Sequence, residues 1–352
     1  MLYFLYDFFG INIFQYITVR AGFGFLFAFI VTQFVLPKFI IWAKNTENHQ
    51  PIFEYAPKTH GAKDGTPTMG GAVFTTITIV SVLLSARLDN LYVWGGIVII
   101  SAFAYIGITD DMAKIKLKTN EAGLSVRSKL IYQFIASAVV ALLLFFIHDH
   151  NLFVPFYKNP LFDMDYFAII FWILVIVASS NAVNLTDGLD GLATVPSIVA
   201  LATLSLIIYV TGHAVISNYL LMPNIKGSGE LFVIGLSLMG SLIAFLWFNS
   251  HPAQIFMGDS GSLPVGAFMG YIAIVGKSEI LLLLIGFIFV FETVSVILQI
   301  GSFKIRKKRV FRMAPIHHHF EQKGWHENKI IVRFWIISFM SNIIALISLK
   351  IR

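Results

Sequence analysis

The sequence predicts an all-α polytopic membrane protein with about ten transmembrane helices in a single integral membrane domain, 1–352. Of its 352 residues, 57% are hydrophobic and only 12% are charged, whereas soluble globular proteins average about 25% charged residues. The charged residues are also clustered. The apolar stretches between them reach about 20 residues, the length with which an α-helix crosses a hydrocarbon core about 30 Å thick.

Three features of the sequence limit the chemistry, the targeting and the partners of the protein. The chain has no cysteine, which excludes disulfides, thiolate catalysis and cysteine-based metal sites. The first basic residue is Arg20, and no basic segment precedes the first apolar stretch, so we expect no cleavable signal peptide. The net charge of +6 could indicate nucleic-acid binding, but lysines and arginines in cytoplasmic loops explain it in a membrane protein. We therefore expect a lipid bilayer as a partner, and no nucleic acid.

The apolar segments define the predicted spans. Residues 1–18 are rich in aromatic side chains and are interrupted by an aspartate and a glycine, which is typical of a segment at the membrane interface. The predicted spans are approximately 20–42, 70–88, 92–109, 130–148, 166–184, 192–211, 231–248, 261–276, 279–301 and 330–349. The eighth is the weakest, because it is short and contains several glycines and a proline. The ninth contains Glu292, Gln299 and Gly301, which are compatible with a break or bend.

Lysine and arginine are concentrated in alternate connecting segments. The alternate segments are 43–69, 110–129, 185–191, 249–260 and 302–329, and the basic residues lie in the first, second and last of them. By the positive-inside rule they are cytoplasmic and both termini lie outside, and an even number of spans is consistent with termini on the same side. The unusual polar clusters lie in the same segments, so the predicted active-site cleft faces the cytoplasm.

The segment 181–193 carries two carboxylates and two amides between apolar runs. In a helix, Asp187 and Asp190 would lie one turn apart with roughly 5–6 Å between their Cβ atoms, where like charges repel. One of them could simply cap the following helix. Together with Asn181 and Asn184 at a membrane boundary, they favour a site for a cation, a substrate hydroxyl or a nucleobase.

The segment 107–118 places adjacent carboxylates, Asp110 and Asp111, at the inner end of the third span. Neighbouring side chains on a helix do not face the same way, so one carboxylate could face a metal ion and the other a reacting group. Lys114 and Lys118 follow at helical spacing, and a solvated face of ion pairs is an equal alternative.

Two further segments combine glycines with polar side chains. In 60–71, Lys63 and Thr68 offer hydrogen-bond donors to phosphate, although the spacing is not that of a Walker loop and an ordinary loop is the alternative. In 249–262, Asp259 lies between small residues that let a ligand approach the backbone. The alternative is that Asp259 caps the eighth span.

The segment 312–321 contains three consecutive histidines and follows a basic run. The basic run suits a membrane anchor or a lipid headgroup contact, and loop histidines are often only solvated. Taken together, the connecting segments supply carboxylates, histidines and lysines without cysteine, which fits magnesium (Mg²⁺) better than zinc. Because Mg²⁺ is usually held by one or two carboxylates and by substrate phosphates, we expect transfer between a soluble nucleotide conjugate and a lipid phosphate.

Four motifs resemble those of the phospho-N-acetylmuramoyl-pentapeptide transferase family, in the polyprenyl-phosphate N-acetylhexosamine-1-phosphate transferase superfamily. They are the pair Asp110 and Asp111, NLTDGLDG at 184–191, FMGDSGS at 256–262 and PIHHHFE at 315–321. The resemblance covers essentially the whole chain. The aspartate motifs mark the superfamily, whereas the triple histidine and TPTMGG at 66–71 favour this family.

The resemblance implies a reaction and its partners. Phospho-N-acetylmuramoyl-pentapeptide would pass from UDP-N-acetylmuramoyl-pentapeptide to undecaprenyl phosphate, with release of UMP and formation of lipid I, the first membrane step of peptidoglycan synthesis in cell wall biogenesis. It places the protein in the bacterial cytoplasmic (inner) membrane, with Mg²⁺ as cofactor, and leaves a homodimer open. We expect direct attack by the lipid phosphate, with a covalent phospho-enzyme on an aspartate as the alternative.

The resemblance also implies roles for individual residues. Asp259 is the expected metal ligand, and Asp110 is expected to activate the lipid phosphate with Asp111 nearby. His317 is the fourth residue expected to be catalytic. The expected substrate-binding residues are Lys63, Thr68, Lys114, Lys118, Asn184, Asp187, Asp190, Asn249, Phe256, Ser262, Gln299, Ala314 and His318.

Two other functions are weighed against this one. An N-acetylglucosamine-1-phosphate transferase of the same superfamily would share the aspartate motifs, but the triple histidine argues against it. A nucleotide-sugar transporter would place ionisable residues inside its spans and would have broken helices in paired positions. Only Glu292 lies conspicuously inside an apolar run, so the sequence favours the transferase.

Overall fold

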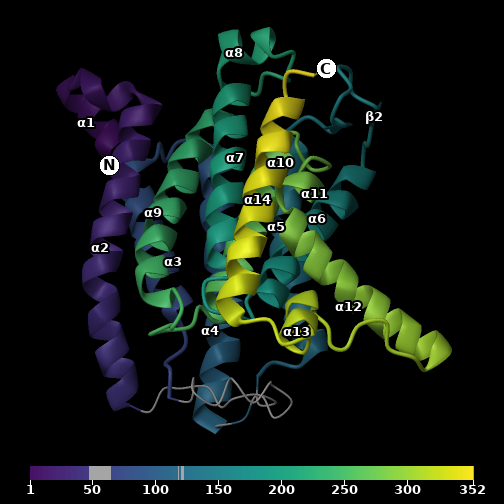
Figure 1. Ribbon diagram of the computed structural model, residues 1–352. Helices are drawn as coiled ribbons and strands as arrows, with labels where there is room; N and C mark the ends of the chain where they lie inside the picture. The colour runs from purple at the N-terminus through teal and green to yellow at the C-terminus, as the bar shows by residue number, and fades with distance from the viewer. Residues whose placement is uncertain (47–64, 118, 120–122, 352) are drawn as a thin grey trace.

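A computed structural model describes residues 1–46, 65–117, 119 and 123–351. Within these ranges the chain is almost entirely helical (Figure 1). In chain order the elements are α1 (Leu2–Phe9), η1 (Asn12–Gln15), α2 (Ile17–Asn45), α3 (Gly70–Ser85), α4 (Leu91–Leu117), α5 (Val126–Ile147), β1 (Asn151–Leu152), β2 (Phe162–Asp163), α6 (Phe167–Thr186), α7 (Thr194–Gly212), α8 (Ala214–Tyr219), η4 (Ser228–Glu230), α9 (Leu231–Asn249), α10 (Asp259–Val275), α11 (Leu282–Ile285), α12 (Phe287–Arg306), α13 (Ile316–Glu321) and α14 (Glu327–Ser348). The short strands pair antiparallel, with Asn151 opposite Asp163.

Eight helical segments of the described chain are long and apolar enough to cross a membrane. They belong to α2, α4, α5, α6, α7, α9, α12 and α14. Each predicted span overlaps a helix, but α3 has only 16 residues and α10 only 17, so helix length alone does not establish a count of ten. The prediction of an all-α, multi-pass membrane protein is confirmed.

Helix α10 is the centre of the fold, because all of its residues are buried. It packs against α4 and α6, and also against α3 and α7. A Cβ atom on Gly266 would lie 2.4 Å from the carbonyl oxygen of Ser179 in α6, so only glycine permits this approach of the two helices. The glycines that made this segment the weakest predicted span are therefore where its neighbours pack most closely.

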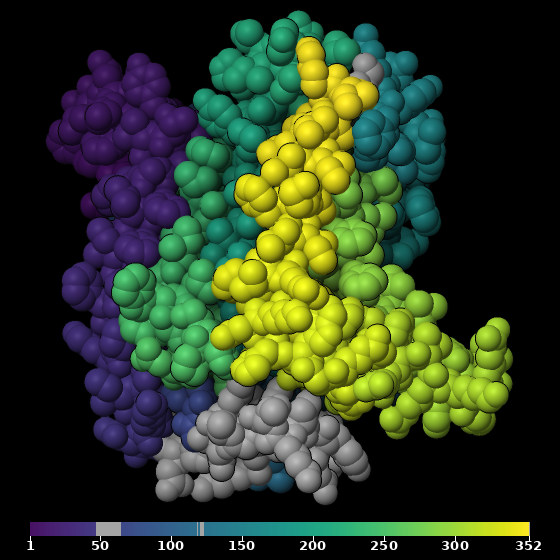
Figure 2. Space-filling view, viewed as in Figure 1, coloured from purple at the N-terminus to yellow at the C-terminus, as the bar shows by residue number. Residues whose placement is uncertain are grey.

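The ninth predicted span is divided into two helices at Gly286, which separates α11 from α12. The break precedes Glu292, Gln299 and Gly301, all of which lie within α12. Beyond the break, α12 slants away from the other helices, and its far end projects from the body of the molecule (Figures 1 and 2). The bend is thus present, but at a different residue from those expected.

The two chain ends lie at one end of the molecule, whereas α13 and the last turns of α4 lie at the other (Figure 1). Helix α1 and η1 lie within the segment 1–18, whose last residues begin α2, and neither α1 nor η1 contains a buried residue. The location of this segment at the membrane interface stays a prediction, as does the single domain over 1–352.

Candidate active site

Asp111, near the end of α4, caps the first turn of α10. Its Oδ1 accepts a hydrogen bond from the backbone N–H of Asp259 at 3.2 Å, and its Oδ2 accepts one from Ser260 N–H at 3.0 Å. The first N–H groups of a helix lack intrahelical partners and favour a negative charge. Asp111 therefore fixes the position of Asp259, which is the first residue of α10 and not its cap; the cap position is Gly258.

The close approach of α4 to α10 depends on glycine. A Cβ atom on Gly107, one turn before Asp111, would lie 2.2 Å from the carbonyl oxygen of Asp259. Gly258 has a φ of 72°, and a Cβ there would lie 2.5 Å from Oδ2 of Asp111. Small residues at these positions let the carboxylate of Asp111 reach the helix end directly.

The loop before α10 is tied to the start of α3. Backbone hydrogen bonds join Gly70 N–H to Phe256 C=O at 3.0 Å, Gly71 N–H to Met257 C=O at 2.9 Å, and Phe256 N–H to Pro67 C=O at 2.9 Å. These bonds place Phe256 beside the segment that carries Thr68. The Thr68 hydroxyl is buried and has no hydrogen-bond partner within the described ranges.

Asp110 and Asp259 share two lysines. Lys114 Nζ lies 2.6 Å from Asp110 Oδ2 and 3.5 Å from Asp259 Oδ2. Lys129 Nζ, from the first turn of α5, lies 3.1 Å from Asp110 Oδ2 and also forms an ion pair with Asp259 Oδ2. Asp110 is buried, so this is an enclosed network and not the solvated ion-pair face that was the alternative.

A divalent cation fits the chemistry of this cluster. Oxygen atoms of Asp110, Asp111 and Asp259 all lie within 4.8 Å of one another, and carboxylate oxygens are the ligands that Mg²⁺ prefers. Asp259 Oδ1 also accepts a hydrogen bond from Asn184 Nδ2 at 2.7 Å, and the same nitrogen donates to Ser262 Oγ at 2.9 Å. Asn184 thus connects the end of α6 with Asp259 and Ser262 at the start of α10.

Asp187 and Asp190 lie in the irregular segment after α6 and not on one helix. Neither caps α7, whose cap residue is Ala193. The pKa of Asp187 is raised from 3.8 to about 8, mainly by burial and to a smaller extent by the negative charges of Asp259, Asp111 and Asp190. The carboxyl group of Asp187 is therefore largely protonated at neutral pH and can donate a hydrogen bond.

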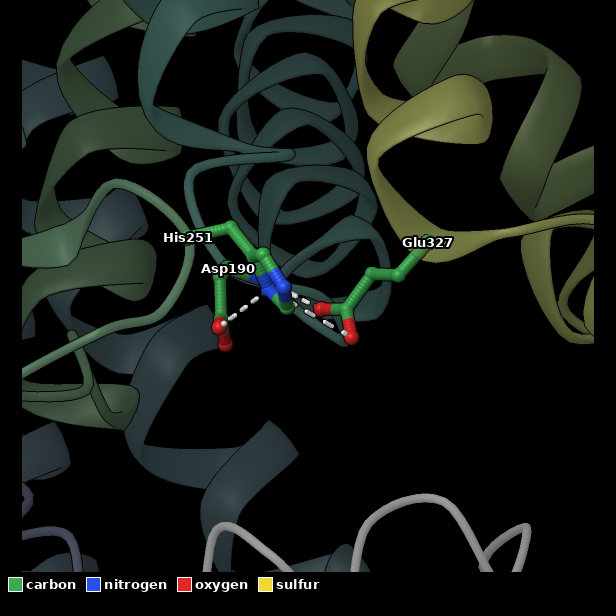
Figure 3. Close-up of side chains that lie close together, drawn as sticks. All are labelled: Asp190, His251 and Glu327. Atoms are coloured by element: carbon green, nitrogen blue, oxygen red, sulfur yellow. Dashed lines mark hydrogen bonds and ion pairs between the residues drawn. The ribbon is translucent and has the colours of Figure 1, made fainter.

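Asp190 belongs to a second cluster, with His251 and Glu327 (Figure 3). Its Oδ2 lies 3.0 Å from His251 Nδ1 and accepts a hydrogen bond from Ala253 N–H at 3.1 Å. Glu327, the first residue of α14, accepts a hydrogen bond from the backbone N–H of Asp190 at 3.2 Å. Two distant parts of the chain, the segment 251–253 and Glu327, therefore hold the loop 187–193 that carries both aspartates, here called the aspartate loop.

Asn249 also holds this loop. Its Oδ1 accepts hydrogen bonds from Gly191 N–H at 3.1 Å and Thr194 Oγ1 at 2.8 Å, and its Nδ2 donates to Ile255 C=O at 3.0 Å. The side chain is buried, and its polar atoms are used within the protein. The Asn249 side chain thus connects the aspartate loop with the loop that precedes α10.

His317 forms a buried pair with Glu292. Its Nδ1 lies 3.1 Å from Glu292 Oε1, and both side chains are at most 1% exposed. In its Nδ1–H tautomer the imidazole donates this hydrogen bond to the carboxylate oxygen. The Nε2 atom is buried without a partner among the described residues, and a Cβ on Gly188 would lie 2.4 Å from it. His317 therefore presents Nε2 to the aspartate loop, while His318 binds Glu321 at 2.6 Å.

The remaining predicted residues are more remote or cannot be placed. Gln299 and Ala314 line a cavity beside α12. Lys63 and Lys118 lie outside the residues that the structure describes.

Four residues of these clusters were not expected from the sequence as members of the site. Lys129, His251 and Glu327 come from separate parts of the chain, and although His251 lies within the segment 249–262, none of the three was assigned to the site. Glu292 was conspicuous as a charge within an apolar run, which was the signal that could have identified it as the partner of His317.

Comparisons with known proteins identify the family of the chain. A family model described as glycosyl transferase family 4 matches residues 93–277, which include Asp110, Asp187 and Asp259. Phospho-N-acetylmuramoyl-pentapeptide-transferases of Aliarcobacter butzleri, Nitratiruptor sp. and Wolinella succinogenes are 65%, 60% and 58% identical to the chain, and each comparison covers 100% of both proteins. The chain belongs to glycosyl transferase family 4 and, within it, to the phospho-N-acetylmuramoyl-pentapeptide-transferase family. The resemblance inferred from the motifs is confirmed, and the protein is a transferase.

Proposed function

We propose that the protein transfers phospho-N-acetylmuramoyl-pentapeptide from its UDP conjugate to undecaprenyl phosphate, releasing UMP and forming lipid I. The observation that carries the proposal is the junction of α4, α6 and α10, where Asp259 meets Asp110, Lys114, Lys129 and Asn184. Carboxylates for a cation beside lysines for phosphate oxygens suit phosphoryl transfer. The relatives that match the whole chain carry the name of this activity.

Mg²⁺ is the proposed cofactor, with Asp259 as its ligand and Asp110 close enough to assist. When bound, the ion would neutralise charge on the transferring diphosphate. Asp111 is less suited to hold it directly, because its oxygens accept hydrogen bonds from backbone N–H groups of α10, whereas the partners of Asp259 are side chains, which can move when an ion binds. Asp111 instead holds Asp259 in position.

The proposed chemical step is direct attack. An oxygen of the lipid phosphate forms a bond to the phosphorus next to the sugar, and the bond from this phosphorus to the bridging oxygen of UMP breaks. Lys114 and Lys129 stabilise the negative charge that gathers on the transferring group and on UMP. Asp110 orients the attacking phosphate through Lys114 and Lys129, to which it is paired; the phosphate is mostly ionised at neutral pH and needs little help from a base.

The donor nucleotide is proposed to bind between the aspartate loop and Phe256. Protonated Asp187 can donate a hydrogen bond to a carbonyl oxygen, and the ring of Phe256 offers a face for stacking. Asn249 supports this site through its bonds to the loop backbone. His317 would direct Nε2 towards the diphosphate or the sugar, with His318 beside it.

The proposed location is the bacterial cytoplasmic membrane, with the site at the cytoplasmic face and both termini outside. The basic residues of the connecting segments support this orientation. The chain ends lie at the opposite end of the molecule from α13 and the last turns of α4, which carry site residues (Figure 1).

The experiment that tests the function supplies purified protein with undecaprenyl phosphate, Mg²⁺ and one UDP-sugar at a time. We expect UMP release with UDP-N-acetylmuramoyl-pentapeptide and none above background with UDP-N-acetylglucosamine. Release with only the second donor would assign the chain to the other transferase reaction. Release with neither donor would contradict transferase activity on these substrates.

A further inference from the structure

A cavity of about 640 Å³ lies between α12 and the segment around α13, away from the carboxylate cluster. Its size is within the range of about 300–1,000 Å³ that is typical of ligand sites. The residues that line it are Val296, Gln299, Ile300, Phe303, Lys304, Arg309, Arg312, Met313, Ala314 and Gln322. None of them is acidic, and three carry a positive charge.

The cavity occupies one face of α12. The helix contributes Val296, Gln299, Ile300, Phe303 and Lys304, which recur at the spacing of a single helical face. The exposed apolar side chains at 287, 291, 294, 298 and 305 lie on the opposite face. This opposite face suits contact with lipid, so the cavity faces away from the most apolar side of α12.

The same face of α12 leads from the cavity to the active site. Glu292 lies one turn before Val296, and its partner His317 contacts the aspartate loop at Gly188. From Glu292 to the cavity residues at 299–304 is seven to twelve residues, or about 10–18 Å along the helix. An extended peptide of five residues spans about 17 Å.

Contacts within the protein fix the backbone beside Arg309 and the side chain of Arg312 at the cavity. Gln299 Oε1 accepts hydrogen bonds from Val310 N–H at 3.0 Å and Phe311 N–H at 2.9 Å, which fixes the segment carrying Arg309. A nitrogen of the Arg312 guanidinium donates to Gln322 C=O at 2.7 Å. Lys304 and Arg309 are exposed, so they are accessible to an anionic group.

We propose that this cavity binds the peptide of the donor substrate, with the free carboxylate at the end of the peptide held by Lys304 and Arg309. The inference rests on the proposed function and adds to it the site that recognises the peptide. A peptide joined through its amino end to a muramoyl group keeps a carboxylate at its other end. With the sugar beside His317, the length of α12 between the two sites matches the length of the peptide.

The test measures steady-state kinetics of Lys304→Glu and Arg309→Glu with two donors, UDP-N-acetylmuramoyl-pentapeptide and the same compound with its terminal carboxylate converted to an amide. For the carboxylate donor we expect each variant to raise KM by about tenfold, the loss expected for one charge-assisted hydrogen bond. For the amide donor we expect the variants to match the unaltered protein. Lys308→Glu is the control, because it makes the same change in the same basic run but Lys308 does not line the cavity.

The outcomes separate this inference from its alternatives. Equal KM values of the variants and the unaltered protein for the carboxylate donor would overturn it. A rise in the KM of undecaprenyl phosphate, with the donor KM unchanged, would assign the cavity to a lipid headgroup and also overturn it. If the unaltered protein released no UMP from either donor, the proposed function would fail, and this inference would fail with it.

Discussion

Asp259 and its neighbours show how far single residues could be assigned from the sequence. Asp110, Asp111 and Asp259 were identified by their motifs, and the structure brings their oxygens within 4.8 Å of one another. The separate roles of the three carboxylates could not be predicted, because they depend on which carboxylate reaches the backbone N–H groups of α10. Lys129 was not assigned to the site, since its proximity arises only from the packing of α5.

Asp187 gives a prediction for the dependence of stability on pH. Its pKa is 3.8 in an ordinary environment and about 8 in the folded protein, so the folded state binds a proton that the unfolded state releases between these values. The stability due to this group is fully present below pH 3.8 and is lost as the pH rises to about 8. Asp187→Asn, which cannot ionise, should therefore unfold at a higher temperature than the unaltered protein, by a margin that grows from pH 5 to pH 8.

Thermal unfolding in detergent at several pH values checks this. A margin that is constant with pH, or that shrinks from pH 5 to pH 8, would show that Asp187 does not titrate in this way.

Glu292 gives a second prediction at this scale, as a positioning residue for His317. Glu292→Ala should lower kcat by about tenfold or more with little change in KM, because a buried charge-assisted hydrogen bond contributes about 1.5–3 kcal/mol. Glu292→Gln keeps an oxygen that accepts from Nδ1 and should retain more of the rate. Glu292→Leu fills a similar space but has no oxygen to accept a hydrogen bond from His317. Equal kcat values for the Leu and Gln variants would therefore show that Glu292 contributes only packing.

At the scale of elements, the sequence predicted where the helices lie, but it did not predict which of them is the most deeply buried. The eighth segment was the weakest predicted span because of its glycines and proline, yet α10 is the most enclosed helix of the described chain. High hydropathy identifies a helix that faces lipid. Glycines in a buried helix instead allow close packing against other helices, and a single sequence does not show which neighbouring helix they face. The break at Gly286 was missed for a similar reason, since the apolar run continues across it.

The packing of α10 gives a prediction about Gly107. A Cβ atom there would lie 2.2 Å from the carbonyl oxygen of Asp259, so Gly107→Ala should displace the start of α10, cost about 1–3 kcal/mol of stability and lower activity. Gly301→Ala is the matched control, because a Cβ there has no neighbour within 4 Å in the described chain. It should be neutral or stabilising by up to about 1 kcal/mol.

Unfolding temperatures and UMP release of the two alanine variants make this comparison. If Gly107→Ala were as stable and as active as Gly301→Ala, the close contact of α4 with α10 would not position Asp259.

At the scale of the whole molecule, the bilayer made the fold class predictable, because its thickness sets the length of each span. Both chain ends lie towards one end of the molecule, on opposite sides of it, and elements that carry the site lie at the other end (Figure 1). From the sequence we could predict that these loops, which come from distant parts of the chain, lie on the same side of the membrane. Their contacts with one another could not be predicted. Contacts such as Asp190 with Glu327 require the three-dimensional arrangement of α6, α9 and α14 (Figure 3). A homodimer stays a prediction.

The most direct measurement is lipid I formation by the unaltered protein and by Asp259→Ala, each folded in detergent and supplied with Mg²⁺, undecaprenyl phosphate and UDP-N-acetylmuramoyl-pentapeptide. We expect the unaltered protein to release one UMP for each lipid I formed, and Asp259→Ala to be folded but inactive. Full activity of folded Asp259→Ala would contradict the central role of this carboxylate.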